Sequence, residues 1–484
     1  MSPSVADRPG NSPVPFIING KDVHPERTFD VVSPATGKVI HAAASASEAD
    51  VRAAVDSAAA AFQKWKTALP KTRRDILLKA ADVMLARNDE LRDYMSAETG
   101  CPHKWSNRNL EIGRDFLIDV AGRLSGLEGS MATPEHADSG AMVLKEPFGV
   151  TLAIAPWNAP YILGVRSVLF PLAAGNTVIL KGSELCPRTM WGICSVFQEA
   201  GLPDGVLNLL FHEPANAAAI TQQLITHPEI KKINFTGSTG VGRIIGRLAG
   251  EQLKPVLLEL GGKAPAIVWE DADLDNAATH VATGAFLNSG QICMSTERVL
   301  VHKSVHAEFG TKLTAAIDRI FGGAQSDPLV LINAVSVSKN KKLLHDAVAK
   351  GATLLYGDAN AQESSDTRMR PVVVSGVTPE MDIYRLESFG PTVSLLEIET
   401  EEEALRIAND TEYGLSSAVF TEDLRRGLRF ARGIETGAVH INSMSVHDES
   451  ALPHGGAKSS GYGRFNTAVG LEEWVRTKTV TFKW

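Results

Sequence analysis

Cys293, in the run Asn288–Met294, is the residue on which the chemistry of this chain depends. A cysteine acts as a nucleophile only as the thiolate, so its surroundings must supply access and positive potential. Gly290 permits close approach of another backbone segment, and we expect Ser289 and Gln291 to keep the approach polar. The alternative is a buried structural thiol, and the choice depends on the residues that could work with Cys293.

Two other side chains have the chemistry that attack on a carbonyl group requires. Glu259 lies in an apolar run, where burial can prepare a carboxylate to act as a general base. It also follows Gly237 at the spacing of a ribose-binding acid, so spacing alone leaves both roles open. Asn158, between two prolines, is held rigidly enough to donate to a developing oxyanion, although it also suits an ordinary turn.

Two further patterns could hold a dinucleotide. The strand-like run 232–236 leads into the glycine turn 237–242 and then a helix, which presents free backbone N–H groups to a pyrophosphate. Its spacing is GxxGxG, so a plain strand-to-helix connection is the alternative. Lys181 and Glu184 follow a strand at the edge where open parallel sheets bind ligands, although a solvated ion pair would look the same.

The elements that would position these residues alternate between strands and helices, which is typical of α/β folds with parallel sheets. Strands are predicted at 150–155, 177–180, 206–210 and 232–236, and a second α/β unit after Glu259 has strands at 266–269 and 298–301 and a helix at 305–320.

The two ends of the chain are expected to differ. A helix should begin at Ser47–Asp50, and one long helix should run from Pro70 until Gly100 ends it. The run 479–484 alternates polar and apolar residues, which predicts a strand that ends in an exposed Trp484. An open strand edge is usually covered by another subunit.

Composition excludes several classes of partner. With 484 residues, the chain is long enough for two or three domains, and its net charge of −8 argues against nucleic acid or an anionic membrane surface. No apolar run is long enough to span a bilayer. Residues 1–15 show no targeting signal and are expected to be a short disordered lead. Four cysteines without CxxC spacing predict a reducing, cytoplasmic location and no metal site.

Six motifs together resemble the NAD(P)-dependent aldehyde dehydrogenase superfamily, in its order and over nearly the whole chain. They are Pro156–Asn158 (PWN), Lys181–Glu184 (KxSE), Phe235–Val241 and Gly242 (FTGSTxxG), Glu259–Lys263 (ELGGK), Gly290–Cys293 (GQxC) and Glu387–Pro391 (ESFGP).

The resemblance implies the α/β aldehyde dehydrogenase fold. A Rossmann-like NAD-binding domain would comprise residues 1–124 and 148–260, and an α/β catalytic domain residues 261–459. A small β oligomerisation element, residues 125–147 and 475–484, would form the interface of a homodimer or homotetramer. The active site would lie in a cleft between the two α/β domains.

The resemblance also assigns roles. Cys293 would be the nucleophile, Glu259 the base that activates water, and Asn158 with the Cys293 N–H the oxyanion hole. Lys181 and Glu184 would hold the adenosine ribose, which leaves Glu259 as the base. The full cofactor set would be Ala155, Pro156, Trp157, Lys181, Ser183, Glu184, Gly237, Ser238, Glu387 and Phe389. Cys293 would form a thiohemiacetal and then a thioester, and the presence of Glu259 favours hydrolysis over acyl transfer to coenzyme A.

Two departures from the family pattern stand out. Gly182 replaces a proline and is expected to loosen the ribose-binding loop, while Glu184 would repel a 2′-phosphate, so NAD is favoured and NADP remains possible. His454 replaces an aromatic residue, and it would either donate a hydrogen bond to a substrate hydroxyl or fill space.

The segments 161–166 and 442–454 look most like those of salicylaldehyde and vanillin dehydrogenases, so an aromatic aldehyde of the benzaldehyde type is the expected substrate. Arg166 could pair with a phenolate or form a structural salt bridge. The expected substrate contacts are Tyr161, Arg166, Ile292, Met294, Val446 and His454. The alternatives are an aliphatic aldehyde or semialdehyde dehydrogenase, a cofactor-free thiol hydrolase, and a non-catalytic protein with this fold.

Overall fold

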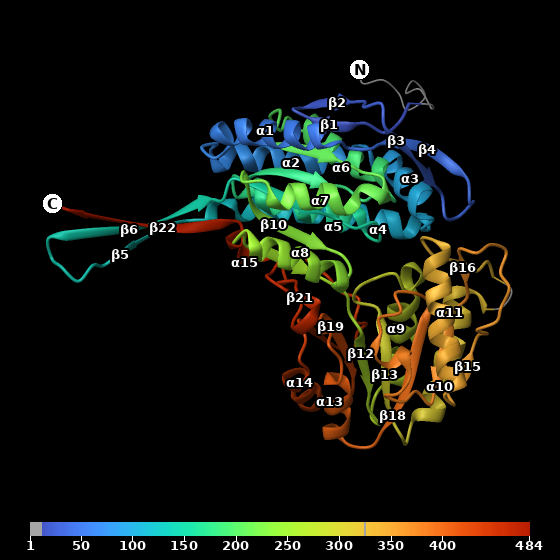
Figure 1. Cartoon of the computed structure of the whole chain (residues 1–484). Helices are drawn as coiled ribbons and strands as arrows, with labels where there is room; N and C mark the ends of the chain where they lie inside the picture. The colour runs from blue at the N-terminus through green and yellow to red at the C-terminus, as the bar shows by residue number, and fades with distance from the viewer. Residues whose placement is uncertain (1–11, 324–325) are drawn as a thin grey trace. The chain divides into compact units, whose positions relative to one another are not determined.

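The computed structural model describes residues 12–323 and 326–484, which divide into two compact units (Figure 1). Unit 1 contains the chain up to Leu258 together with Glu449–Pro453 and Gly463–Trp484. Unit 2 contains Glu259–Asp448 and His454–Tyr462.

The helices are α1 (Glu48–Trp65), α2 (Pro70–Ala86), α3 (Asn88–Thr99), α4 (His103–Arg123), α5 (Pro160–Ala173), α6 (Pro187–Glu199), α7 (Ala217–Thr226), α8 (Thr239–Glu251), α9 (Leu274–Phe286), α10 (His306–Phe321), α11 (Ala334–Ala349), α12 (Asp382–Arg385), α13 (Glu401–Asn409), α14 (Leu424–Gly433) and α15 (Thr467–Glu472). The strands are β1 (Phe16–Ile18), β2 (Lys21–Val23), β3 (Thr28–Val32), β4 (Val39–Ala44), β5 (Ser130–Ala132), β6 (Ser139–Pro147), β7 (Val150–Ile154), β8 (Thr177–Lys181), β9 (Leu207–Leu210), β10 (Ile230–Thr236), β11 (Val256–Glu259), β12 (Ala264–Val268), β13 (Thr296–His302), β14 (Leu329–Val330), β15 (Thr353–Tyr356), β16 (Arg368–Met369), β17 (Val372–Ser375), β18 (Thr392–Ile398), β19 (Ser416–Phe420), β20 (Ala438–Ile441), β21 (Gly461–Tyr462) and β22 (Val475–Lys483).

The main sheet of unit 1 has the strand order β2-β1-β9-β8-β7-β10-β11. Strands β9, β8, β7 and β10 are parallel to one another, as the alternation of the sequence predicted. The chain moves outward from β7 through β8 to β9 and then returns to place β10 on the other side of β7. The carboxyl edge of β7 and β10 is therefore a topological switch point, the usual ligand position in an open α/β sheet.

The N-terminal helices confirm one prediction and correct another. Ser47 caps α1 through a capping box with Asp50. The single helix predicted from Pro70 to Gly100 is wrong, because the chain breaks at Arg87 (φ −102°, ψ 16°) between α2 and α3. The Arg87 guanidinium pairs with Glu90 and donates to the hydroxyl of Ser195 in α6, so tertiary contacts fix the break. Gly100 does end α3, in the left-handed conformation.

The predicted disordered lead, residues 1–15, is too long. Residues 1–11 lie outside the described part of the chain, but Val14 is buried and belongs to the fold. Its amide donates to the Ala42 carbonyl, and its own carbonyl accepts from the Ala44 amide.

A three-stranded antiparallel sheet, which we call the arm, is formed by β5, β6 and β22 (Figure 1). The predicted terminal strand pairs with β6 over nine residues, from Val475 opposite Pro147 to Lys483 opposite Ser139. Just before β22, Trp474 is fully buried, and its carbonyl accepts a hydrogen bond from the Asn176 amide group at 2.9 Å. The arm is thus attached to the core of unit 1.

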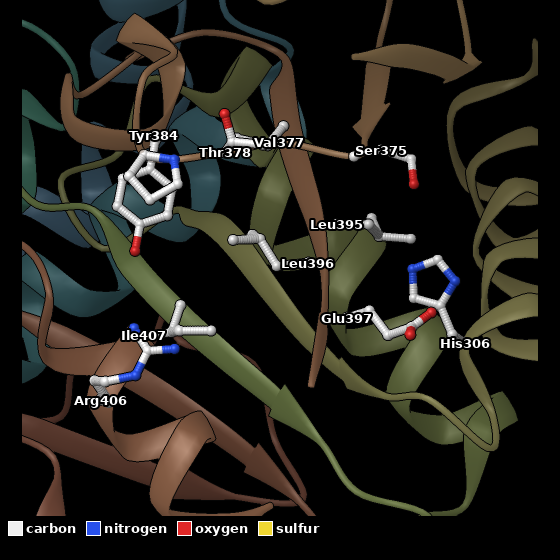
Figure 2. Close-up of a pocket in the computed structure, with 12 residues that line it drawn as sticks. His306, Ser375, Val377, Thr378, Tyr384, Leu395, Leu396, Glu397, Arg406 and Ile407 are labelled. Atoms are coloured by element: carbon white, nitrogen blue, oxygen red, sulfur yellow. The ribbon is translucent and has the colours of Figure 1, made fainter. Parts of the chain in front are cut away.

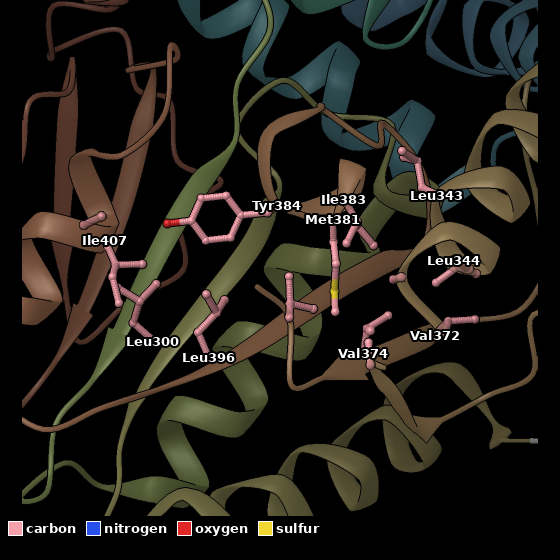
Figure 3. Packing of buried hydrophobic residues seen from close by; sticks show 14 of the residues in the cluster. Leu300, Leu343, Leu344, Val372, Val374, Met381, Ile383, Tyr384, Leu396 and Ile407 are labelled. Atoms are coloured by element: carbon pink, nitrogen blue, oxygen red, sulfur yellow. The ribbon is translucent and has the colours of Figure 1, made fainter. Parts of the chain in front are cut away.

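Unit 2 is built on a sheet of order β15-β17-β18-β13-β12-β19-β20. Among its described strands, β15 pairs with β17 in antiparallel orientation, and all other neighbouring strands are parallel. The predicted strands at 266–269 and 298–301 correspond to β12 and β13, and the predicted helix to α10. Figure 3 shows buried side chains on one face of this sheet, where Leu300 and Leu396 meet Tyr384, Ile383 and Met381. This core fixes the strands whose ends carry the candidate site.

Candidate active site

The predicted cofactor residues of unit 1 come together at the carboxyl edge of its main sheet. Ala155–Asn158 follow β7, Lys181–Glu184 begin at the end of β8, and Gly237 and Ser238 follow β10. Because β7 lies between β8 and β10 in a parallel arrangement, these three loops are neighbours at the switch point.

The amino end of α8 offers backbone N–H groups at this edge. Ser238 is the N-cap residue (φ −71°, ψ 147°), is exposed, and makes no side-chain capping bond to the helix. Gly237 is required by packing, since a Cβ there would lie 2.4 Å from the ring of Phe235. An uncapped helix start of this kind is suited to a pyrophosphate, so the residues of unit 1 fit a dinucleotide.

Burial governs the charges near Lys181. It lowers the pKa of the Lys181 ammonium, and the attraction of Glu184 opposes the shift. Burial, with Lys181 as a second cause, lowers the pKa of His212 to about 4. His212 is therefore neutral at pH 7, and its Nε2 is buried without a hydrogen-bond partner among the described residues. Sequence reasoning missed His212, which carries no motif.

Gly182 does not loosen the loop as predicted. Its amide donates to the Leu210 carbonyl at 3.0 Å, a bond that a proline could not make. A Cβ at this position would lie 2.7 Å from the ring of Phe211. Glycine here permits close packing against Phe211, and the loop that carries Lys181 and Glu184 is anchored rather than freed.

Asn158 is buried, and its backbone is held by a residue that sequence reasoning missed. The indole N–H of Trp105, in α4, donates to the Asn158 carbonyl at 3.1 Å. A second bond fixes α4 itself, because the Asn109 amide group donates to the Trp105 carbonyl. A rigid loop is what a preorganised oxyanion donor requires.

The two predicted substrate contacts on α5 lie in the interior of unit 1. Tyr161 is fully buried, and its hydroxyl donates to the Leu91 carbonyl at 2.7 Å. Its polar group is thus already used, and we leave Tyr161 out of the proposed site. Arg166 is also buried, with its guanidinium over the rings of Phe465 (4.8 Å) and Phe116 (6.0 Å).

In unit 2, the backbone that leads to Cys293 has an unusual conformation. Asn288, Ser289 and Gly290 have φ values of 49°, 61° and 72°, so three successive residues are left-handed. A Cβ on Gly290 would lie 2.1 Å from the Gly390 carbonyl oxygen, which confirms the predicted close approach. Such strain persists only where the surroundings over-determine the loop. Cys293 is half-buried, whereas the other three cysteines are buried.

Ser289 and Gln291 were predicted to keep the approach to Cys293 polar. Both side chains are instead buried. The Ser289 hydroxyl donates to the Val330 carbonyl at 2.8 Å. The Gln291 side chain donates to the Asn288 carbonyl and accepts from the Ile332 amide. Both side chains fasten the strained loop to the neighbouring segment 330–332.

The glycines of the ELGGK motif are packed against two other motifs. A Cβ on Gly262 would lie 2.2 Å from the Cys293 carbonyl oxygen, and one on Gly261 would lie 2.6 Å from the Glu387 carboxylate. The Gly262 amide also donates to Oε1 of Glu387 at 2.9 Å. The three motifs therefore interlock through positions where any side chain would clash.

A buried ion pair that sequence reasoning missed supports the loop of Glu387 and Phe389. Lys263 pairs with Glu297, whose carboxylate accepts from the amides of Ser388 (2.9 Å) and Phe389 (3.2 Å). Phe389 has a positive φ of 50° and needs this support. Burial, with the charge of Glu297 as a second cause, raises the pKa of Glu387 to about 7.

The remaining predicted substrate contacts of unit 2 lie beside Cys293 or close to Ser445. Ile292 and Met294 flank Cys293 and are almost fully buried, as is Val446. The Ser445 hydroxyl donates to the Met294 carbonyl at 2.7 Å and lies 2.8 Å from the Thr296 hydroxyl. Val446 is thereby held near the nucleophile loop.

The imidazole of His454 is directed at Glu259. Its Nε2 lies 2.8 Å from Oε1 of Glu259, and its Nδ1 lies 3.7 Å from a carboxylate oxygen of Asp448. Glu259 is 1% exposed and His454 9%. The imidazole was predicted either to donate to a substrate hydroxyl or to fill space, and its Nε2 instead lies against the candidate base.

Comparison with known proteins shows the family of this chain. Residues 22–480 match the model of the aldehyde dehydrogenase family. The chain belongs to the aldehyde dehydrogenase family. It is 43% identical to vanillin dehydrogenase of Pseudomonas fluorescens (97% of this chain, 98% of the relative). It is 38% identical to salicylaldehyde dehydrogenase of Pseudomonas sp. strain C18 (96% of each). It is 36% identical to a probable NADP-dependent succinate-semialdehyde dehydrogenase of Sinorhizobium fredii (93% and 92%).

A solved structure extends the likeness to three dimensions. The salicylaldehyde dehydrogenase of Pseudomonas putida G7, complexed with salicylaldehyde, superposes with a TM-score of 0.94 at 36% identity, over 98% of each chain. The predicted fold class is confirmed, and the chain is an NAD(P)-dependent aldehyde dehydrogenase.

This aldehyde dehydrogenase also has a hollow of about 320 Å³ in unit 2 that contains none of the predicted site residues. Figure 2 shows His306 and Glu397 at one end of it, with Leu395 and Leu396 in its wall. It lies toward the carboxyl ends of β17 and β18, whereas Cys293 precedes β13.

Within residues 12–323 and 326–484, no helix is long and apolar enough to cross a membrane.

Proposed function

We propose that this aldehyde dehydrogenase oxidises an aromatic aldehyde to its carboxylic acid, with NAD as the preferred hydride acceptor. The observation that carries the proposal is the similarity, over almost the whole chain, to vanillin and salicylaldehyde dehydrogenases. The semialdehyde dehydrogenase of Sinorhizobium fredii is less similar, at 36% identity.

In the proposed mechanism, the Cys293 thiolate attacks the aldehyde carbon. The oxyanion that forms accepts hydrogen bonds from the Asn158 side chain and the Cys293 amide. Bound NAD supplies the acceptor for the hydride that leaves this carbon, and a thioester on Cys293 remains. Glu259 takes a proton from water as the water oxygen bonds to the thioester carbon. The carbon–sulfur bond then breaks, its electron pair returns to Cys293, and the acid is released.

The cofactor residues would divide between the two ends of NAD. Lys181 and Glu184 would hold the adenosine ribose, with Ser183 closing the loop. The amino end of α8, at Gly237 and Ser238, would face the pyrophosphate. A carboxylate at position 184 repels a 2′-phosphate, which favours NAD over NADP.

The other proposed cofactor residues would lie near the nicotinamide end of NAD. Ala155, Pro156 and Trp157, after β7, would line the path to the nicotinamide. Glu387 and Phe389 would lie at the nicotinamide ribose and ring, and the Glu297 carboxylate fixes their loop.

For the substrate, we retain Arg166, Ile292, Met294 and Val446 as proposed contacts. Apolar side chains and one cation would suit an aromatic ring that carries a phenolic or carbonyl oxygen. A semialdehyde is the second candidate, because its distal carboxylate would also pair with Arg166.

The test is the initial rate of NADH formation with benzaldehyde-type, aliphatic and ω-carboxylated aldehydes at saturating NAD, repeated with NADP. We expect kcat/KM for hydroxylated benzaldehydes to exceed that for succinate semialdehyde at least about tenfold, the effect of one well-placed contact. Equal or higher kcat/KM with the ω-carboxylated aldehyde would overturn the aromatic assignment.

We also propose that the arm covers the interface of a homodimer or homotetramer in a cytoplasmic enzyme. Met131 and Trp484 on the arm are 79% and 78% exposed, and an open strand edge with apolar side chains is usually covered. Four free cysteines suit a reducing compartment. Sedimentation of the wild type and of Met131→Glu tests the interface, because an added charge should dissociate the oligomer. A monomeric wild type would contradict it.

A further inference from the structure

We propose that His454 is a positioning residue for the general base Glu259, and that Asp448 supports it. The inference rests on the proposed function, in which Glu259 activates water for thioester hydrolysis. The observation that motivates it is a row of three titratable side chains with little exposure, in which His454 lies between two carboxylates. Its Nε2 is 2.8 Å from Oε1 of Glu259, and its Nδ1 is 3.7 Å from Oδ1 of Asp448.

The segments that carry the two partners are fastened together close to the pair. The Leu260 amide donates to the Ser460 carbonyl at 2.9 Å, and the Ser460 hydroxyl donates to the Gly261 carbonyl at 2.6 Å. Ser460 is fully buried. The segments that follow Glu259 and His454 are therefore tied to each other, which limits their independent movement.

Close backbone packing fixes His454 from the other side as well. A Cβ on Gly437 would lie 1.8 Å from the Gly455 carbonyl oxygen, and one on Gly456 would lie 2.7 Å from the Ser460 side chain. The loop after His454 thus has little freedom to turn the imidazole away from Glu259.

The chemistry of the contact depends on which atoms hold protons. An imidazole whose Nε2 carries a proton donates to Oε1 of Glu259 and leaves Oε2 to accept the proton of a water molecule. A proton on Nδ1 faces the Asp448 carboxylate, and the doubly protonated ring satisfies both carboxylates. A carboxylate that accepts such a hydrogen bond is held in one orientation, and a positioned base requires this.

This assignment separates two steps of the reaction. Attack by Cys293 and hydride loss do not need Glu259 as a base, whereas thioester hydrolysis does. Loss of His454 should therefore slow hydrolysis and spare the formation of the thioester.

The test compares His454→Phe, which keeps a ring of similar size without the hydrogen bond, with His454→Gln, whose amide can still donate to Glu259. Rapid-mixing measurements with an aromatic aldehyde and NAD give the NADH burst and the steady-state rate. For His454→Phe, we expect a burst rate within about threefold of the wild type and a steady-state rate about 10- to 100-fold lower, the effect of one charge-assisted hydrogen bond. His454→Gln should recover most of the loss, and Asp448→Asn should show a smaller change of the same kind.

A second measurement does not depend on the aldehyde. p-Nitrophenyl acetate acylates a thiolate directly and releases nitrophenolate, after which the acyl enzyme must be hydrolysed. His454→Phe should retain the nitrophenolate burst and slow its steady state.

Three outcomes would overturn the inference: equal slowing of burst and steady state, a change in aldehyde KM alone, or no effect in either assay. Circular dichroism and thermal unfolding of both variants identify a folding defect, and His454→Gln keeps the test open in that case. If instead the wild type forms no NADH with aromatic aldehydes but hydrolyses the ester with a burst, the substrate proposal fails and the role of His454 is still tested.

Discussion

The two units place their candidate site residues at opposite ends of their parallel strands. In unit 1, the predicted cofactor loops follow the carboxyl ends of β7, β8 and β10. In unit 2, the loops 261–263, 290–295 and 387–391 precede the amino ends of β12, β13 and β18. The rule that open α/β sheets bind ligands at their carboxyl edge therefore applies to the first unit, and in the second it leads instead to the hollow of Figure 2.

The two edges also position residues by different physical means. Unit 1 offers the amino end of α8 and loops that follow strands directly, so the sheet itself sets their places. Unit 2 holds its loops by contacts in which Gly262 and Gly290 touch neighbouring carbonyls, and by the buried charge of Glu297. A Cβ on Gly182 or Gly237 of unit 1 would meet the side chains of Phe211 or Phe235, whereas one on Gly262 or Gly290 of unit 2 would meet backbone carbonyls. We infer that an added methyl group at these glycines is harder to accommodate in unit 2, because backbone moves less easily than a side chain.

The largest expected effect is that of Cys293→Ala, which should lower kcat for NADH formation at least about 1,000-fold, because the nucleophile is lost. Steady-state kinetics with an aromatic aldehyde measure it. The matched control is Cys194→Ala, a buried thiol whose pKa burial raises far above the usual range. It should keep wild-type kcat, and activity in Cys293→Ala near that level would contradict the proposed role of unit 2.

Gly262→Ala tests whether unit 2 depends on backbone contact. The added Cβ would meet the Cys293 carbonyl at 2.2 Å, so either loop must shift by about 1 Å, and we expect kcat to fall about 100-fold in a folded enzyme. Gly122→Ala in α4 is the control, because a Cβ there meets nothing within 4 Å. Equal activities of the two variants would show that the close contact is not important.

Glu184→Ala tests the edge of unit 1. In its proposed role, Glu184 accepts hydrogen bonds from the adenosine ribose. Its removal should then raise KM for NAD about tenfold, and KM for NADP should fall relative to KM for NAD. Initial rates with both cofactors measure the ratio. Glu199→Gln, on an exposed carboxylate that pairs with Arg87, is the control and should leave the ratio unchanged. An unchanged ratio in Glu184→Ala would remove Glu184 from the cofactor site.

The smallest effect concerns Glu387 and pH. Its pKa is raised to about 7 from 4.5, so the folded state keeps a proton that the unfolded chain has released. Stability should therefore fall as pH rises from about 4.5 through 7. Glu387→Gln cannot ionise, so its melting temperature should exceed that of the wild type by about 2–4 °C at pH 8 and equal it at pH 5.

Differential scanning fluorimetry of the cofactor-free enzyme at both pH values makes this measurement. Glu402→Gln, at an exposed position in α13, is the control and should show no such difference. A lower melting temperature of Glu387→Gln at pH 8 would contradict the raised pKa.

Local patterns were sufficient to predict much of the fold. Alternating apolar runs predicted β7, β8, β9, β10, β12 and β13, because burial on both faces of a parallel strand leaves a plain signal. The capping box of Ser47 and Asp50 predicted the start of α1. The break at Arg87 could not be predicted, since no glycine or proline marks it and its partner Ser195 lies on another helix.

In the candidate site, too, local patterns predict some features, and contacts between distant residues determine the others. Glycine at positions 262 and 290 follows from backbone approach and can be read from the motifs. Glu297 could not be identified, and the contact of His454 with Glu259 could not be predicted, because both depend on partners far along the chain: the amides of Ser388 and Phe389, and the carboxylate of Glu259. A lone glutamate in a strand and a histidine in a loop carry no local sign of such contacts.

The path of the chain through the two units also sets an order of synthesis. Residues 463–484 belong to unit 1, and Trp474 is fully buried there against Asn176. The ribosome delivers these residues only after the whole of 259–448 has been made. Unit 2 has its full sequence once Tyr462 has been made, whereas unit 1 lacks Gly463–Trp484 until the end of synthesis. Until then Trp474 is missing from the core of unit 1. We therefore expect unit 1 to be the last part of the molecule to complete its packing.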